Sequence, residues 1–180
     1  MFLALLRSVN VGGKNRVEMA KLKGVFESLG FTKTKTFIAS GNVLFESPIT
    51  DHVMLVKKIE SALESVFGIH INVLIRDTKS MKDLVNAIPE SWANDTETKC
   101  DVMFLWKEID NADVLKQLPY NPEIEDVMYV PGAIIWRIDR SKATRSKMFK
   151  IVGTKLFKLM TVRNPNTVRK LYELMLSQSV

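Results

Sequence analysis

The polar segment at residues 7–15 carries the side chains best suited to hold a charged ligand. It follows an apolar run at residues 2–6 and contains two consecutive glycines beside a lysine. Glycines let the backbone turn so that several N–H groups face one point, a geometry that binds phosphate or carboxylate. The helix expected next would add its N-terminal dipole. The segment therefore predicts an anion site with these candidate contacts: Arg7, Asn10, Gly12, Gly13, Lys14 and Asn15.

A plainer interpretation competes with that site. The P-loop spacing G-x-x-x-x-G-K-[ST] is absent, and so is a dinucleotide fingerprint. A glycine turn closed by an Asn cap explains the segment without a ligand, because Gly-Gly turns need none. The sequence leaves both interpretations open.

A second candidate site lies at the start of the last expected helix. Asn164 is placed to cap that helix and Pro165 to occupy its first turn, so a well-capped helix explains both. It does not explain Arg163, and a basic side chain beside a helix N-terminus is typical of an anion site. The candidate contacts here are Arg163, Asn164, Asn166 and Thr167.

A block of ten basic residues without an acidic one extends from residue 140 to residue 172, in a chain of net charge +6. Such a block creates a positive field that attracts phosphates, nucleic acid or an acidic partner. The alternative is a solvated helix face. The basic residues are Arg140, Lys142, Arg145, Lys147, Lys150, Lys155, Lys158, Arg163, Arg169 and Lys170.

Residues for proton-transfer or nucleophilic catalysis form no evident set. The two histidines, His52 and His70, lie on or beside apolar patterns and are read as structural residues. The lone Cys100 begins an apolar strand pattern and is read as a small buried hydrophobe. No zinc site or cofactor is assigned. An enzyme that positions a phosphorylated small molecule with Arg, Lys and Asn stays open.

Composition and termini favour a cytoplasmic protein without a membrane partner. The 180 residues are 46% hydrophobic and 26% charged, as in an ordinary globular chain. The apolar N-terminus is too short for a signal peptide, and no apolar stretch approaches the ~18 residues that span a membrane. One cysteine fits a reducing compartment. The oligomeric state is not predicted.

The spacing of apolar residues predicts a βαββαβ order in the first half of the chain. Asn15 stands three residues before Glu18, which predicts a capping box for the first helix. Thr50 or Asp51 is expected to cap the second helix, whose core face is predicted as Val53, Val56, Ile59 and Leu63. The expected strands cover residues 2–6, 34–38, 42–45 and 69–75, and Gly30 and Gly68 are expected to end the helices.

The same order is expected again in the second half, after a linking helix at 79–87. Strands are predicted at 101–106, 125–129, 133–138 and 159–162, and helices at 110–117, 146–159 and 165–176. The residues Glu123, Glu125 and Asp126 are read as an acidic turn. We therefore predict an α+β protein of two tandem ferredoxin-like halves, residues 1–77 and 78–180, with a linking and a terminal helix.

Strand pairing in such a half bears on the candidate site. The first and third strands are expected to be antiparallel neighbours. On that basis we place loop 7–15 far from the corner Ser40-Gly41-Asn42, which is read as a plain hairpin turn. The loop would then need help from the second half, with Arg163 as the first residue to consider.

Four segments in this order carry a resemblance to a known family. Residues 4–15, Leu29-Gly30-Phe31, Ser40-Gly41-Asn42-Val43 and residues 163–168 are similar to the family named domain of unknown function 1697. The resemblance implies a bacterial-type cytosolic protein of two ferredoxin-like halves, and implies no activity. This chain has Ser8, Glu18 and Pro165 where members usually have Gly, Pro and Trp. If that Trp stacks on a ligand, this protein does without it.

Nucleic-acid binding is the main alternative to a small anionic ligand. Phe104, Trp106 and Trp136 lie in expected strands, and ferredoxin-like sheets bind RNA through such aromatics. The RNP1 pattern is missing, however, and Phe104 and Trp106 share a face with Val102 that would be core. We therefore predict a protein that binds a phosphate-bearing ligand, with RNA or DNA binding through residues 140–172 as the alternative.

Overall fold

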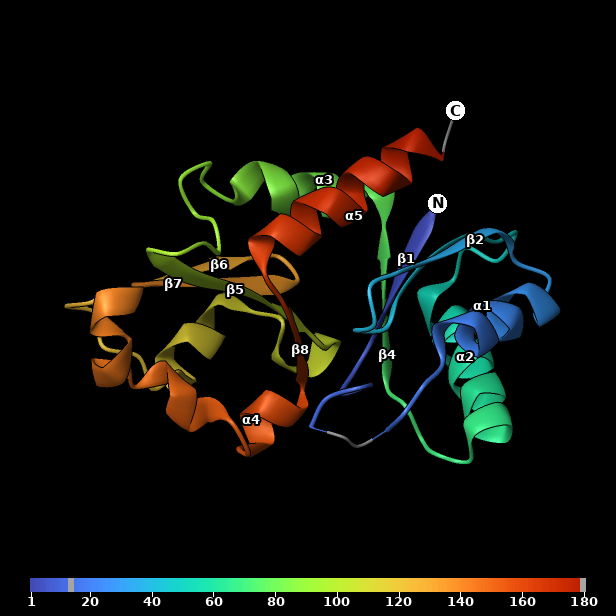
Figure 1. Ribbon diagram of the computed structural model, residues 1–180, viewed down its shortest axis with the longest axis horizontal. Helices are drawn as coiled ribbons and strands as arrows, with labels where there is room; N and C mark the ends of the chain where they lie inside the picture. Colours follow the sequence, from blue (N-terminus) through green and yellow to red (C-terminus); the bar gives the residue numbers. More distant parts are fainter. Residues whose placement is uncertain (13–14, 179–180) are drawn as a thin grey trace. The chain divides into compact units, whose positions relative to one another are not determined.

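The computed structural model describes residues 1–12 and 15–178 and has an α+β fold with two four-stranded antiparallel sheets (Figure 1). The chain divides into two compact units, Met1–Met81 with Leu171–Val180, and Lys82–Lys170. Among the described residues, no helix is long and apolar enough to cross a membrane.

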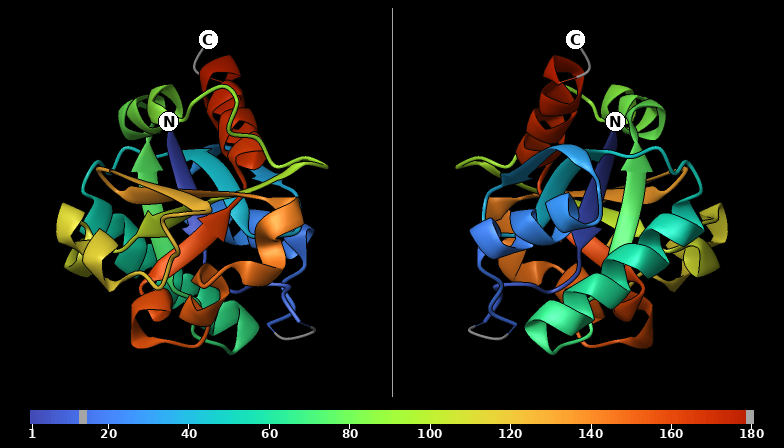
Figure 2. Two further views of the ribbon diagram at one scale, coloured as in Figure 1. Left: turned by 90° about the vertical axis from the view of Figure 1, so that its left-hand side faces the viewer. Right: turned by 90° about the vertical axis from the view of Figure 1, so that its right-hand side faces the viewer.

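The first unit contains a sheet with strand order β2-β3-β1-β4. Helices α1 and α2 lie side by side on one face of this sheet (Figures 1 and 2). The elements are β1 (Phe2–Leu6), α1 (Met19–Ser28), β2 (Thr32–Phe37), β3 (Asn42–Glu46), α2 (His52–Phe67) and β4 (Val73–Asp77).

The core of the first unit lies between this sheet and its two helices. Alternating strand residues such as Ala4 and Leu6 belong to the same buried cluster as Leu22 of α1 and Leu63 of α2. Phe45 anchors the cluster, with its ring centroid 4.7 Å from that of Phe31. Every residue of β1 is buried, so the strand is covered on both faces.

Local signals for the helix ends are confirmed in part. Asp51 caps α2 by accepting hydrogen bonds from two main-chain N–H groups, and Gly68 ends it in the left-handed conformation. The prediction that Asn15 caps the first helix is wrong. That helix begins at Met19 after Glu18, whose side chain makes no capping hydrogen bond.

The predicted core face of α2 is also partly wrong. Val53 is 64% exposed, whereas Leu55, Ile59 and Leu63 are buried. Residues 55, 59 and 63 follow each other at a spacing of four and form one stripe, while residue 53 lies about 200° around the helix from residue 55. Val56 is only partly buried.

The second unit holds a sheet with strand order β6-β7-β5-β8. Its strands are β5 (Thr98–Leu105), β6 (Glu125–Val130), β7 (Ala133–Asp139) and β8 (Met160–Arg163). The remaining elements of the chain are α3 (Thr78–Ala87), α4 (Lys155–Lys158), α5 (Pro165–Ser177) and the 3-10 helices η1 (Lys107–Ile109), η2 (Ala112–Gln117), η3 (Arg140–Arg145) and η4 (Met148–Ile151).

The α-helices predicted at 110–117 and 146–159 are wrong, because short 3-10 turns take their place, followed in the second case by the brief α4 (Figure 1). Hydroxyl side chains divide the second region. Ser146 accepts from the main-chain N–H of Met148, and Thr154 donates to the carbonyl of Ile151. Such local bonds compete with a continuous helix. Gly153, at φ 87°, completes the break.

The buried stripe of α2 leads to a stability prediction. Leu55→Ala should lower the free energy of unfolding by about 2–5 kcal/mol, because it removes buried methyl groups and leaves a cavity. Val53→Ala, two residues away on the exposed face, should change it by less than about 0.5 kcal/mol. Urea unfolding followed by circular dichroism measures both, and equal losses would contradict the orientation of α2.

Candidate functional site

The loop after β1 packs against the corner before β3. Leu5 pairs with Asn42, and the main-chain N–H of Leu6 donates to the carbonyl of Gly41 over 2.8 Å. The predicted separation of loop 7–15 from Ser40-Gly41-Asn42 is therefore wrong. In an antiparallel pair the end of one strand lies beside the start of the other, so these two segments must meet.

A third segment joins them, because the main-chain N–H of Arg7 donates to the carbonyl of Asn72 over 2.9 Å. The two asparagines of the loop bind the loop itself. The amide of Asn10 donates to the carbonyls of Val17 and Ala39 and accepts from the N–H of Val17, each over 2.9 Å. That uses both hydrogens of the amide nitrogen. Asn15 donates to the carbonyl of Ser8 over 3.1 Å.

The backbone of this loop is strained. Ser8, Asn10 and Asn15 have positive φ angles between 50° and 56°, a region that costs energy for any residue other than glycine. Gly12 is exposed at φ 60°. The other two predicted contacts, Gly13 and Lys14, lie outside the described residues.

The start of α5 is closed by the chain's own groups. Asn164 caps the helix as predicted, accepting from the N–H of Thr167 over 2.8 Å. The side chain of Asn166 makes two hydrogen bonds to the main chain of Asn94. Arg163 is buried and donates to the hydroxyl of Thr161 and the carbonyl of Val162. Burial lowers the pKa of Arg163 to about 10, so its guanidinium stays charged at neutral pH.

Five basic side chains of the second unit lie on the segment that connects β7 to β8. We call residues 145–158 the cationic segment, after Arg145, Lys147, Lys150, Lys155 and Lys158. All five side chains are exposed, and none of these side chains has a hydrogen-bond or ion-pair partner among the residues that the structure describes. The flanking basic residues differ. Arg140 and Arg169 donate to main-chain carbonyls, and Lys142 pairs with Asp139 over 2.9 Å.

A buried carboxylate anchors this segment. Glu125, only 2% exposed, accepts hydrogen bonds from the Trp136 indole, the Ser146 hydroxyl and the main-chain N–H groups of Asn121, Lys147 and Met148. Burial alone raises the pKa of Glu125, but these hydrogen bonds outweigh it, so the pKa is lowered. The interpretation of Glu125 as part of an acidic turn is wrong, because it is the first residue of β6 and is buried. It faces inward on β6, at a strand position that alternation with Val127 and Tyr129 would have indicated.

A mainly apolar hollow of about 230 Å³ opens beside the cationic segment. Its walls include Met103, Trp136 and Met148, and the exposed side chain of Phe149 packs edge-on against the Trp136 ring. Lys99 Nζ lies 5.8 Å from the centroid of the Trp136 ring and 3.2 Å from the Asp101 carboxylate. The sequence gives no signal for Lys99 or Asp101, because their place depends on strand pairing.

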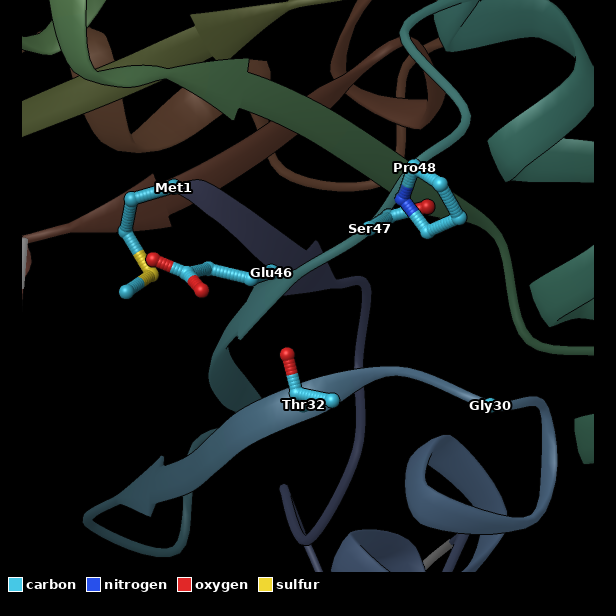
Figure 3. A pocket seen from close by; sticks show the side chains of 6 residues that line it. All are labelled: Met1, Gly30, Thr32, Glu46, Ser47 and Pro48. Carbon is cyan, nitrogen blue, oxygen red and sulfur yellow. The ribbon is translucent and has the colours of Figure 1, made fainter.

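Two other hollows are polar. One, of about 340 Å³, lies where β2 begins and β3 ends in the first unit, and Figure 3 shows the Glu46 carboxylate and the Thr32 hydroxyl beside it. Glu46 is already paired with Lys33 over 3.3 Å. The other, of about 460 Å³, contains Arg137 and Asp139, which pair with each other over 2.8 Å. In each hollow these charged groups already have a partner within the protein.

The residues considered for catalysis lie apart. Cys100 is buried as predicted, and burial raises the pKa of its thiol to about 12, so it stays neutral. His52 lies 3.9 Å from Asp77, and His70 lies 3.6 Å from Glu64, both on the surface. Within the described part of the chain, no three His, Cys, Asp or Glu side chains gather in a way that could hold a metal ion.

Comparison with known proteins identifies relatives by sequence and by fold. A family model described as "Protein of unknown function (DUF1697)" matches residues 1–136, which confirms the resemblance. The chain is similar to the structure of conserved bacterial protein SP0830 from Streptococcus pneumoniae, with a TM-score of 0.82, 24% sequence identity and 97% of each chain covered. At that identity the likeness shows the fold alone. No curated protein matches the chain.

The contact of the loop with its corner can be tested at Gly41. A Cβ there would lie 2.4 Å from the Val9 side chain, whereas one at Gly30 would meet nothing within 4 Å, although both glycines have positive φ. Gly30→Ala should cost about 1–2 kcal/mol of stability. Gly41→Ala should cost about 1–3 kcal/mol more, through overpacking. Chemical denaturation of both variants measures the difference, and a smaller loss for Gly41→Ala would disprove the contact.

The anchoring role of Glu125 predicts a pH dependence. The pKa of Glu125 is lower in the folded state than in the unfolded state. Its contribution to the free energy of unfolding is therefore complete above about pH 4.3, the usual pKa of an unfolded Glu, and is lost as the pH falls through the folded-state pKa. Glu125→Gln should cost roughly 1–3 kcal/mol at neutral pH and remove this acid-dependent part. The exposed Glu123→Gln is the control. Thermal melts from neutral pH to pH 3 compare them, and identical profiles for the two variants would refute the anchor.

Proposed function

We propose a function from the premise that the chain belongs to the family described as Protein of unknown function (DUF1697). The proposal is that the protein binds an anionic partner through the cationic segment of its second unit. One observation carries it: the five exposed basic side chains of residues 145–158 have no partner within the described part of the chain.

The density of charge supports binding over a merely solvated face. The five cations lie close together in the sequence, within residues 145–158, which fold as short turns. Charges closer than the Debye length, about 8 Å at physiological salt, act together. Their summed field attracts and orients an anion before contact, in a chain whose net charge, these five cations included, is +6.

The residues of loop 7–15 and of the start of α5 remain candidate contacts, but most of them are already engaged with their own chain. Arg7 keeps its place in the proposal as a half-buried cation at the end of β1. Asn10, Asn15 and Asn166 are engaged with their own chain, and Arg163 is buried with internal partners. We therefore give the cationic segment the primary role and do not require Arg7 and Arg163, which belong to different units, to share one ligand.

Nucleic acid is the second candidate partner, favoured by the basic block. Phe104 and Trp136 are fully buried, so they offer no stacking platform for bases. Binding would rest on phosphate contacts and would depend steeply on salt. An enzyme acting on a phosphorylated small molecule is the third. The cationic segment carries Arg and Lys, which hold a phosphate but do not take up a proton at neutral pH, so we propose binding rather than catalysis.

We also infer that each unit is a ferredoxin-like half. The strand orders β2-β3-β1-β4 and β6-β7-β5-β8 support this inference, since each half has its first and third strands as the central pair. The second half departs from the pattern, because 3-10 turns stand where its helices would be.

Charge removal tests the proposal. The triple variant Lys147→Gln, Lys150→Gln, Lys155→Gln should bind an anionic probe about tenfold more weakly, since three exposed ion pairs at about 0.5 kcal/mol each are lost. The matched control is Lys57→Gln, Lys82→Gln, Lys107→Gln, which removes the same charge elsewhere. Fluorescence anisotropy with short RNA, with labelled ATP and with a poly-glutamate peptide, at about 50 and about 200 mM salt, measures affinity. Equal loss in both triples, or no binding of any probe, would refute the cationic segment as the site.

A further inference from the structure

We propose that the hollow beside the cationic segment receives one large apolar side chain of an acidic peptide segment in a partner protein. The inference rests on the proposed function and names its partner class. Chemically, the partner would combine an apolar anchor, such as Leu or Phe, with flanking Asp or Glu residues.

The hollow forms because short turns cover one face of the second sheet only in part. Residues Met103 and Trp136, on neighbouring strands β5 and β7, face Met148 and Ile151 of η4 in one apolar cluster. Because η4 is a single short turn, it covers this face incompletely, where a continuous helix would have filled the space. The opening is bordered by Phe149, which is 46% exposed.

The volume of the hollow indicates which kind of group can fill it. Sites for small molecules and cofactors enclose roughly 300–1,000 Å³, and this hollow has about 230 Å³. That space suits a single side chain better than a nucleotide or a drug-sized ligand. Apolar walls with an indole at their base stabilise such an anchor by removing it from water.

The surroundings select the charge of the peptide. Val152, 65% exposed, and Phe149 stand between the cations Lys147, Lys150 and Lys155 of the cationic segment. Apolar groups flanked by cations without partners are complementary to an apolar residue flanked by carboxylates. Lys99 also lines the hollow, but it is paired with Asp101 over 3.2 Å, so the net positive charge comes from the cationic segment. Phe149 and Val152 protrude beside the hollow, but the hollow itself is concave and accepts a single side chain, which a flat bilayer does not supply.

The decisive experiment compares two labelled acidic peptides that differ only in one central residue, Leu or Ser. The Leu peptide should bind about tenfold more tightly, because its side chain is buried in the hollow. Phe149→Ala should remove this advantage and leave the Ser peptide unchanged. Val53→Ala, an exposed apolar position in the first unit, is the control. Wild-type tryptophan fluorescence should change with the Leu peptide only, since Trp136 lines the hollow, a readout that does not depend on the folding of any variant.

The outcomes separate this inference from the proposed function. Equal binding of both peptides would overturn the hollow as an anchor site while leaving the cationic segment as an anion site. Binding of short RNA, or of phosphatidylserine vesicles, without binding of either peptide would overturn the peptide as the partner class. If no anion of any class binds, the proposed function fails as well.

Discussion

The second unit depends on one buried carboxylate. Glu125 lies in the core next to the Trp136 indole, and an uncompensated charge there would cost several kcal/mol. The charge is tolerated because donors from three separate places converge on it: the turn at Asn121, the indole on β7 and the chain at residues 146–148. The loss of any one donor leaves the buried charge less well compensated. The carboxylate thus fixes where the chain goes after β7.

That path determines everything proposed for function. Once residues 146–148 are tied to Glu125, the following chain crosses the sheet as short turns, and Thr154 and Gly153 keep those turns from merging. The cations point outward because the apolar residues between them, Met148 and Ile151, enter the core. The hollow is what remains uncovered. A strong polar contact at the start of the segment therefore sets both the charged surface and the gap beside it.

The sequence predicts what depends on near neighbours. Most of the strands, the caps at Asp51 and Asn164 and the end at Gly68 follow from local hydrogen bonding and backbone preference, although β4 begins at Val73 and not at residue 69. The rest depends on partners distant in sequence. Glu125 looks like a surface acid until β7 and residues 146–148 are placed around it. The contact of loop 7–15 with Gly41 follows from the antiparallel pairing of β1 with β3, because the end of one strand lies beside the start of the other.

Glu125 fixes the path of the cationic segment mainly through its main chain, so the exposed side chains are not needed for that path. Apart from the Ser146 hydroxyl, the groups it binds there are main-chain N–H groups, which every residue except proline possesses. The path of the chain therefore depends little on which side chains it exposes. Relatives could exchange cations for other surface residues and keep the same route, so partner choice could diverge rapidly on an unchanged frame. The segment is a natural place to graft new recognition chemistry by design.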